Sequence, residues 1–503
     1  MVKYDNAICT GKMTFEECEL AILRQAVDES DERRAQKMIM NDDIKKIIDI
    51  LETFLRSKPL ICYGGTAINN ILPKSDQFYN RDLEIPDYDF YSKNALNDCI
   101  ELANIYADAG YKDVEAKAGV HHGTFKVYVN FIPIADITAL HESIFDELLK
   151  ESIKVAGIKY ASPNFLRMNM YLEMSRPQGD VTRWEKVFKR LVLLNKHYPI
   201  NSSVSCDKVP FQTQLSKSTI QSITPINGDK NNNTIEEQVS DAIKNSLISL
   251  GAVFIGGYAC NLYSEYMSKN QKRKIENYAD YDAIVEDIDK VALIVKEQIE
   301  DILPSNANIM LIKHAEISEI IPRHIEIKIG EDKVAVLYEP IACHSYNKIK
   351  EGNNEINVAS IDTLLNFYLA FMFSNKKYYN KNKILCMANY LFDVQQHNRL
   401  SQKGLLNRFS IDCYGKQQTL EDIRSEKAEK YKELASKRGT VEYDDWFLKY
   451  NPNDKRRKPS KTAVHEKVED AFVMSPGQKP KTAVKRRHKR RNKKTRKAPA
   501  FLY

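Results

Sequence analysis

The chain has 503 residues, of which 43% are hydrophobic, and a formal net charge of +7. This length exceeds what one hydrophobic core usually organises, so we expect two or three domains. No charged start followed by an apolar stretch is present, and the longest apolar run, Leu364 to Phe373, is interrupted by Asn366 and too short to cross a bilayer, which argues against secretion and membrane insertion.

The cysteines are scattered and form no C-x-x-C pair. There are nine of them, which are Cys9, Cys18, Cys62, Cys99, Cys206, Cys260, Cys343, Cys386 and Cys413. This pattern predicts a reduced intracellular protein.

The first predicted elements are a helix, a strand and a second helix. Apolar residues between Ile44 and Leu55 follow the 3.6-residue period, and Asn41-Asp42-Asp43 precede them as caps. Residues 60–63 then form a short buried strand that enters the Gly64-Gly65 turn, and residues 66–72 form the next helix.

Composition divides the rest of the chain. Residues 201–233 are rich in Ser, Thr, Asn and Lys, without sustained periodicity. Helix 235–250 and strand 253–255 then restate the order of the beginning, and helical, aromatic segments follow Ser360. The sequence predicts a first lobe with N-terminal helices over 1–200, a linker over 201–233, a second lobe with a helical supplement over 234–450, and a tail over 451–503.

Ten of the basic residues lie within residues 485–497 of the tail. Without them 65 basic and 68 acidic side chains remain, a net charge of −3, so the basic character belongs to the tail. A block of like charges repels itself and is disordered alone. It would attract nucleic acid or serve as a solubilising or targeting segment, and basic runs carry no base-reading geometry that separates these uses.

Three segments occur twice, in the same order. Residues 61–69 (ICYGGTAIN) are echoed by residues 254–261 (FIGGYACN), Asp87-Tyr88-Asp89 by Asp280-Tyr281-Asp282, and residues 127–136 by residues 334–343. In this alignment Thr66 becomes Tyr258 and Asp136 becomes Cys343. The two lobes are therefore predicted to share one build.

Asp87 and Asp89 are the central pair of acids. Alternate residues of a strand face the same way, so the two carboxylates project together and favour a divalent cation. A competing pair, Asp82 and Glu84, has the same spacing, but Pro86 suits the start of a strand at Asp87 and leaves that pair in a loop. A lone D-x-D is common, and a solvated strand face is the alternative reading.

Two further features surround this pair. Gly64 and Gly65 at a strand-to-helix turn let the backbone approach a ligand, and the helix N–H groups and the Thr66 hydroxyl are donors for phosphate oxygens. Asp136 ends an alternating strand that can lie beside the pair. A phosphate cradle and three carboxylates are the minimum for two Mg²⁺ ions that bridge a nucleoside triphosphate and an attacking hydroxyl.

This arrangement resembles the nucleotidyltransferase superfamily that contains DNA polymerase β and the poly(A) polymerases. More closely, four segments between residues 41 and 392 resemble the poly(A) polymerase catalytic subunits of giant viruses and related large cytoplasmic DNA viruses. They are residues 61–72, residues 85–92, residues 165–177 with the following Arg183 to Leu191, and residues 360–371.

The resemblance implies an α/β (α+β) fold of two nucleotidyltransferase-like lobes, each a mixed sheet flanked by helices. It implies that Asp87 and Asp89 bridge Mg²⁺ (or Mn²⁺) ions, that Asp136 completes the site, and that Gly64, Gly65 and Thr66 hold the triphosphate of ATP. Arg183, Lys186 and Arg190 are candidates to neutralise the triphosphate or the RNA backbone, against the alternative of a solvated basic helix face.

The implied activity is template-independent poly(A) addition to single-stranded RNA 3′ ends, with a homodimer or a viral processivity subunit as partner. The implied location is the host cytoplasm (viral factory), with packaging in the virion as a further expectation. The alternatives are another terminal nucleotidyltransferase, adding UMP or CCA, and a non-catalytic nucleic-acid-binding scaffold.

The second copy is predicted to be pseudo-catalytic. A thiol at Cys343 is a poor Mg²⁺ ligand, so the cluster with Asp280 and Asp282 is incomplete unless another acid, such as Glu326 or Glu339, joins it. His121-His122 superficially resembles a metal pair, but a loop or strand-end role is expected because no acid or cysteine stands at ligand spacing.

Overall fold

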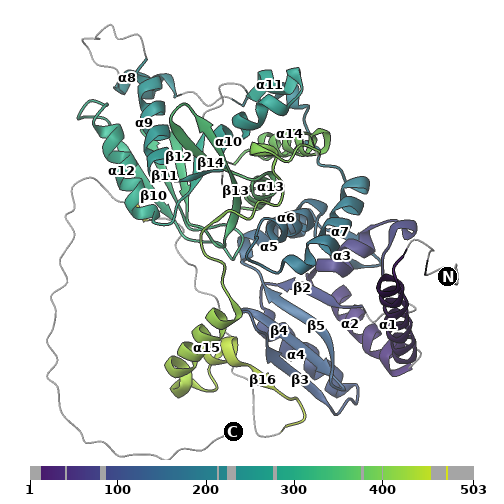
Figure 1. Cartoon of the computed structure of the whole chain (residues 1–503). Coiled ribbons are helices and arrows are strands. Elements are labelled where there is room, and N and C mark those ends of the chain that lie inside the picture. Colours follow the sequence, from purple (N-terminus) through teal and green to yellow (C-terminus); the bar gives the residue numbers. More distant parts are fainter. Residues whose placement is uncertain are drawn as a thin grey trace, which may run out of the picture.

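The structure is a computed structural model that describes most of the chain (Figure 1). The described residues are 9, 13–39, 42–79, 86–211, 215–223, 234–275, 280–374, 376, 379–398, 400–454 and 472–473. The predicted loop pair Asp82 and Glu84 and the basic run 485–497 lie outside them.

The first lobe is built on an eight-stranded mixed sheet of order β16-β3-β4-β5-β2-β1-β7-β6. Its strands are β1 (Ile61–Tyr63), β2 (Tyr88–Ser92), β3 (Val114–Ala118), β4 (Thr124–Val129), β5 (Ile132–Ala139), β6 (Ile153–Val155), β7 (Ile158–Tyr160) and β16 (Lys449–Tyr450). Its helices are α1 (Phe15–Ile39), α2 (Asp42–Ser57), α3 (Gly64–Ile71), α4 (Ala95–Asp108), α5 (Glu142–Lys150), α6 (Pro163–Met174) and α7 (Trp184–His197). Ile44, Ile47 and Leu51 lie on the buried side of α2, which confirms the predicted amphipathic helix.

The second lobe is built on a nine-stranded mixed sheet of order β15-β13-β14-β8-β9-β12-β11-β10-β17. Its strands are β8 (Val253–Phe254), β9 (Tyr281–Ile284), β10 (Ile309–His314), β11 (His324–Ile329), β12 (Asp332–Tyr338), β13 (His344–Glu351), β14 (Asn354–Ala359), β15 (Cys413–Tyr414) and β17 (Phe472–Val473). Its helices are α8 (Lys217–Ile223), α9 (Ile235–Ser249), α10 (Gly257–Leu262), α11 (Lys269–Ile275), α12 (Ile288–Glu300), α13 (Ile361–Phe371) and α14 (Lys381–His397). A capping box of Thr234 and Glu237 starts α9.

The two sheets share their topology. The order β3-β4-β5-β2-β1-β7-β6 corresponds strand by strand to β10-β11-β12-β9-β8-β14-β13, with the same parallel or antiparallel sense at every pairing. Even the register shift recurs, between Val127 and Tyr128 in β4 and between Ile327 and Lys328 in β11. The strands that carry the repeated motifs therefore occupy equivalent positions.

The lobes meet through equivalent helices. Helix α6, which follows β7, packs against α13, which follows β14, near the centre of the molecule (Figure 1). Phe165 of α6 and Phe373, just beyond α13, contact edge to face with ring centroids 5.0 Å apart. Their shared apolar contact holds the two lobes in one body.

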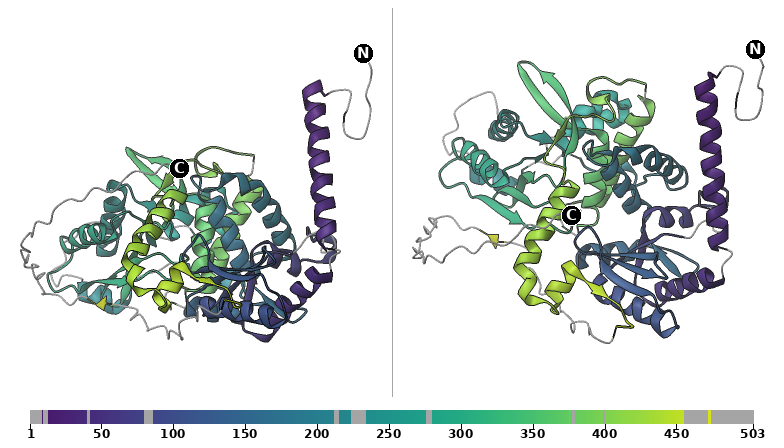
Figure 2. Two further views of the ribbon diagram at one scale, coloured as in Figure 1. Left: turned by 90° about the horizontal axis from the view of Figure 1, so that it is seen from below. Right: turned by 60° about the horizontal axis from the view of Figure 1, so that its bottom comes forward.

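The chain returns to the first lobe after completing the second. Helices α15 (Leu420–Leu434) and α16 (Val441–Phe447) lead into β16, which pairs with β3. Figure 2 shows these helices running from the second lobe to the first, and it shows α1 projecting away from the body. The sequence predicted that all residues from 234 to 450 lie in the second lobe. Lys449 and Tyr450 instead pair with β3, so β16 belongs to the first sheet.

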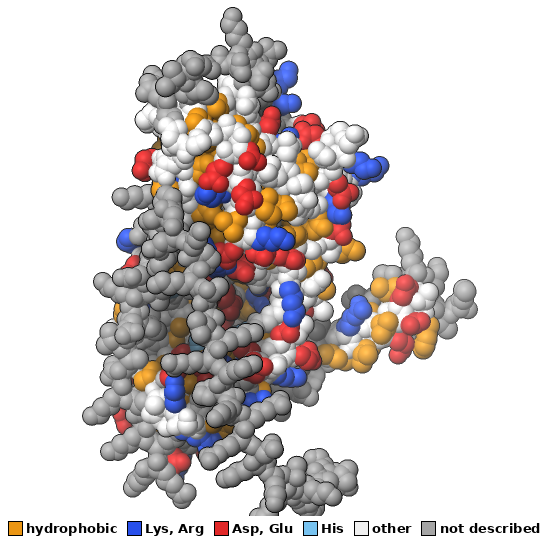
Figure 3. Space-filling view, turned by 90° about the vertical axis from the view of Figure 1, so that its left-hand side faces the viewer, with side chains coloured by type: hydrophobic (Ala, Val, Ile, Leu, Met, Phe, Trp, Pro, Cys, Tyr) orange, Lys and Arg blue, Asp and Glu red, His pale blue; other side chains and the backbone are white. Residues whose placement is uncertain are grey.

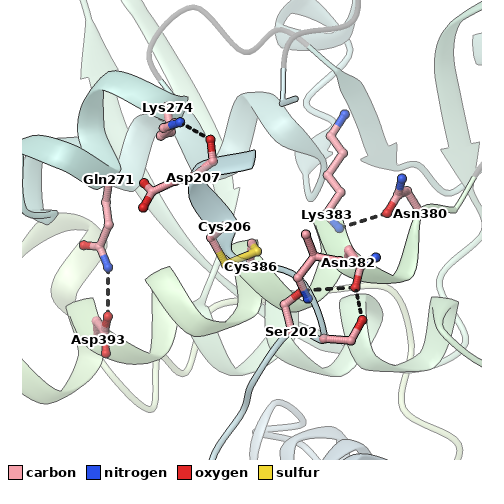
Figure 4. Close-up of a disulfide and its surroundings, with 12 residues drawn as sticks. Ser202, Cys206, Asp207, Gln271, Lys274, Asn380, Asn382, Lys383, Cys386 and Asp393 are labelled. Atoms are coloured by element: carbon pink, nitrogen blue, oxygen red, sulfur yellow. Dashed lines mark hydrogen bonds between the residues drawn. A yellow bond between two sulfur atoms is a disulfide. The ribbon is translucent and has the colours of Figure 1, made fainter. Parts of the chain in front are cut away.

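Six of the nine cysteines form disulfides, which corrects the expectation of a fully reduced chain. The pairs are Cys9–Cys18, Cys206–Cys386 and Cys343–Cys413, while Cys62, Cys99 and Cys260 are free and buried. Cys206, in the predicted linker, bonds to Cys386 of α14, and Ser202 donates a hydrogen bond to Asn382 beside it (Figure 4). No cysteine spacing indicates this pair, because the partners lie 180 residues apart in the chain.

One face of the described surface is mixed in charge. On the face in Figure 3, acidic and basic side chains are interspersed with apolar ones, in keeping with the net charge of −3 that remains without residues 485–497. Among the described helices, none combines the length and hydropathy that a bilayer crossing requires.

Candidate active site

The predicted acids lie on one face of the first sheet. Asp89 in β2 is directly opposite Tyr63 of β1 and Asp136 of β5, and Asp87 precedes β2. Directly opposed residues on neighbouring strands share a face, and Asp87 shares it with Asp89 through the two-residue period. The fold thus brings Asp136, far along the chain, beside the D-x-D pair.

The electrostatics reflect this proximity. Burial raises the pKa of Asp89 to about 7, and the charges of Asp87 and Asp136 add to the effect. Burial and Asp136 likewise raise the pKa of Asp87. Lys126 opposes both shifts but does not cancel them, so the charged forms of both carboxyl groups are disfavoured here.

Asp136 differs from the prediction in its immediate contact. Its carboxylate accepts a hydrogen bond from the Lys126 ammonium, which projects from the neighbouring position of β4. In the described part of the chain, no three His, Cys, Asp or Glu side chains approach closely enough to form a metal-binding group. The expected convergence of three carboxylates is therefore incomplete, because the carboxylate of Asp136 is paired with the Lys126 ammonium.

The glycine turn lies against this cluster. Gly64 adopts a φ of +70°, and a Cβ on it would come within 2.6 Å of Asp89 Oδ2. A Cβ on Gly65 would lie 2.7 Å from Tyr79 Oη and 3.0 Å from the Arg190 guanidinium. Both glycines thus make room for side chains at the start of α3.

Thr66 has a different partner from the one predicted. Its side chain is buried, and its hydroxyl donates a hydrogen bond of 2.6 Å to the Asp87 carbonyl. The hydroxyl therefore fixes the backbone before β2 and positions Asp87.

The basic residues of the Arg183 to Leu191 segment face this site unequally. Arg183 is half exposed and pairs with Glu173 at 2.9 Å, and its charge offsets part of the rise in the pKa of Asp89. Lys186 is exposed, and its charge offsets part of the rise in the pKa of Asp87. These effects place both cations within electrostatic range of the aspartates.

Arg190 lies closest to the glycine turn. Its guanidinium lies over the rings of Phe78 and Tyr79, 5.1 and 5.5 Å from their centroids, and donates a hydrogen bond to the Tyr79 hydroxyl. We did not identify the Phe78-Tyr79 pair from the sequence, because it stands in a stretch without periodicity.

The second lobe replaces the acid cluster by an ion triad. Lys333 Nζ lies 3.0 Å from Asp280 Oδ1 and 3.4 Å from Asp282 Oδ1. Burial by itself would lower the pKa of Lys333, but the two aspartates raise it overall. The ammonium therefore stays charged and balances one of the two carboxylates, while burial raises the pKa of Asp282.

The predicted counterpart of Asp136 was wrong. By register, Val336 of β12 is opposite Asp282 as Asp136 is opposite Asp89, and Glu326 of β11 is opposite Val336 as Lys126 is opposite Asp136. Cys343 lies beyond the end of β12, in its disulfide. The sequence alignment paired Asp136 with Cys343, seven positions beyond Val336, because it followed the shared Pro-Ile-Ala segment and not the strand register.

Comparison with known proteins agrees with the motifs. Residues 49–180 match the family of the poly(A) polymerase catalytic subunit. This segment contains the glycine turn and all three aspartates, so the predicted resemblance is confirmed there.

Similar proteins come from large DNA viruses. A putative poly(A) polymerase catalytic subunit of Acanthamoeba polyphaga mimivirus is 27% identical over 277 residues, 50% of this chain and 46% of that protein. One of African swine fever virus is 31% identical over 173 residues, 33% of this chain and 36% of that protein. The chain thus spans less than half the length of these curated relatives.

The overall fold resembles a solved structure. The Megavirus polyadenylate synthase superposes with a TM-score of 0.70 at 19% identity, covering 90% of this chain and 87% of that one. The two-lobed mixed α/β architecture is therefore confirmed at the level of the fold.

Proposed function

We propose that the chain is a template-independent poly(A) polymerase that adds AMP from ATP to RNA 3′ ends. One observation carries the proposal: Asp87, Asp89 and Asp136 share a sheet face beside the Gly64-Gly65 turn, within the segment that matches the poly(A) polymerase family. Single-stranded RNA and ATP would be its substrates, and we propose a homodimer as the simpler assembly.

The residues present fit a divalent cation. Asp87 and Asp89 offer the carboxylate oxygens that Mg²⁺ prefers, and burial together with the neighbouring carboxylates raises their pKa values, which a bound cation would counteract. When bound, Mg²⁺ or Mn²⁺ would neutralise charge on the phosphates. Asp136 would join these ligands after its carboxylate leaves Lys126.

The chain's own groups would position the triphosphate. The N–H groups that begin α3, at Gly64 and Gly65, are donors for phosphate oxygens. Arg190 lies over the same turn, and Arg183 and Lys186 add positive charge. The RNA 3′-oxygen then bonds to the α-phosphorus of ATP as the bond to pyrophosphate breaks and the hydroxyl proton is released, so no covalent protein intermediate is needed.

The test is primer extension. Purified protein, an unstructured RNA, Mg²⁺ and each nucleoside triphosphate separately should give long tails from ATP. Replacing Asp87→Asn together with Asp89→Asn should lower the rate by at least about 10²–10³-fold, since electrostatic stabilisation of the transferring phosphate is lost.

Asp301→Asn, at an exposed position of the second lobe, is the matched control and should retain the full rate. Equal use of UTP or CTP would contradict adenylate specificity. Undiminished extension by the double variant would remove the assignment of the site.

A further inference from the structure

A cavity of about 1260 Å³ continues the sheet face that carries the aspartates. Its floor includes Tyr63, Tyr91 and Thr138. Tyr91 and Thr138 each stand two residues beyond an aspartate of the cluster, so their side chains project on the same face, about 6–7 Å farther along. The cavity therefore begins where the candidate active site ends.

Three distant parts of the chain form its walls. They are the loop between β3 and β4, the segment 316–320 of the second lobe, and helices α15 and α16. The helices are held there because β16 joins the first sheet directly after them. The return of the chain to the first lobe is thus what closes the cavity.

The volume exceeds what one small ligand needs. Pockets for small molecules usually span roughly 300–1,000 Å³. A cavity of 1260 Å³ beside a nucleotidyl-transfer site has room for more than one nucleotide unit.

Aromatic rings line it in two stacked pairs. Tyr63 stacks on Tyr91 with centroids 3.9 Å apart, and its hydroxyl lies 2.9 Å from the Thr138 hydroxyl. His122 stacks on Trp446 with centroids 4.1 Å apart, and its Nε2 lies 2.9 Å from Asp445. Hydrogen bonds orient both pairs, and rigid aromatic faces are the usual platforms for unstacked bases.

The charges of the lining indicate which part of a nucleotide enters. Lys93 is engaged by Asp146 at 2.7 Å and by Glu142 at 3.0 Å, and Lys427 donates to the Gly119 carbonyl. The acids of the lining are Glu316, Glu319, Glu426, Glu442 and Asp445. Carboxylates repel phosphates but accept hydrogen bonds from ribose hydroxyls and amino groups of bases.

We propose that this cavity receives the terminal bases of the RNA 3′ end, stacked on the His122–Trp446 pair and on Tyr63. The inference rests on the proposed function for its substrate class, and it assigns the RNA backbone to the outside of the cavity. His122, predicted from the sequence to have a loop role, gains a binding role through Trp446.

Tryptophan fluorescence tests the proposal without catalysis. The chain has two tryptophans, Trp184 and Trp446. Oligo(A) RNA, titrated into full-length protein without ATP or Mg²⁺, should quench the Trp446 emission in wild type and in Trp184→Phe. Trp446→Phe should remove that signal.

Affinity measured by anisotropy gives the magnitude. Trp446→Ala should weaken oligo(A) binding about five- to hundredfold, because stacking of one base contributes about 1–3 kcal/mol. His122→Ala should also weaken oligo(A) binding. Because His122 lies in the facing loop, this variant leaves the sequence of α16 unchanged and controls for misfolding of that helix. The KM for ATP and the salt dependence of RNA binding should stay unchanged, and Phe131→Ala, an aromatic that is 84% exposed in a turn, should bind like wild type.

Two results would overturn the inference. One is unchanged RNA affinity in both Trp446→Ala and His122→Ala. The other is quenching by a peptide of residues 485–497 at lower concentrations than by RNA, which would make the acidic cavity a docking site for the chain's own basic tail. Asp87→Asn with Asp89→Asn should still bind RNA, so failure of the catalytic proposal is distinguishable from failure of this one.

Discussion

The Lys126 ammonium lies close to Asp87, Asp89 and Asp136, and its presence is the main difference between the observed site and the expected one. Its ammonium holds Asp136, while burial and repulsion raise the pKa of Asp87 and Asp89. Alternation along β2 made the D-x-D pair predictable, but the partner of Asp136 depends on the register of β4 with β5, which no local pattern reveals.

The first prediction concerns this lysine. Lys126→Met removes the cation that competes with a metal for Asp136, so Mn²⁺ should bind more tightly, by a few-fold to about tenfold, the effect of roughly 1 kcal/mol. Mn²⁺ titration followed by electron paramagnetic resonance, without RNA or ATP, measures the change. Lys150→Met, which removes a lysine that pairs with Glu147 on α5, should leave the affinity unchanged. Weaker binding by Lys126→Met would mean that the lysine positions Asp136 for the metal.

At the scale of elements, what the sequence predicted well was local. The helix, strand and glycine turn over residues 44–72 follow from periodicity and from Gly64, which has a left-handed φ. The counterpart of Asp136 was missed because it depends on which strands pair. Lys333, whose ammonium lies between Asp280 and Asp282, was missed because it stands 51 positions after Asp282.

The second prediction tests this ion triad. Lys333→Met should destabilise the protein by up to about 3–5 kcal/mol, since it removes the ammonium that lies between Asp280 and Asp282, while the charge of Lys383 remains. Adding Asp280→Asn and Asp282→Asn to this variant should recover part of the loss, measured by denaturant unfolding. Lys348→Met, from an exposed pair with Glu355, should cost less than about 1 kcal/mol.

Metal binding gives a second readout of the triad. In a background of Asp87→Asn and Asp89→Asn, Mn²⁺ should stabilise the Lys333→Met protein but not the protein that retains Lys333, because only the former has lost the ammonium that lies between Asp280 and Asp282. Mn²⁺ binding to the second lobe with Lys333 in place would contradict the idea that the Lys333 ammonium takes the place of a metal ion between Asp280 and Asp282.

At the scale of the molecule, the chain is arranged as two similar lobes whose equivalent helices, α6 and α13, pack on each other. This is the geometry of an isologous contact formed within one chain. The segment α15–α16–β16 and the Cys206–Cys386 disulfide then tie distant segments together. Such long-range ties explain why composition predicted two lobes but not the cavity between them.

The third prediction concerns how the proposed RNA substrate would be held. The face in Figure 3 mixes charges, and ten basic residues lie in 485–497, so this run should supply much of the salt-dependent attraction. Deletion after Val484 should lower RNA affinity at low salt and reduce the slope of log affinity against log salt by up to about 7, since each phosphate contact to a single strand contributes about 0.7. Addition of a single nucleotide should persist, because the site and the cavity are intact. An unchanged slope, measured by anisotropy between low and moderate salt, would leave the tail a targeting segment and assign RNA attraction to Arg183, Lys186 and Arg190.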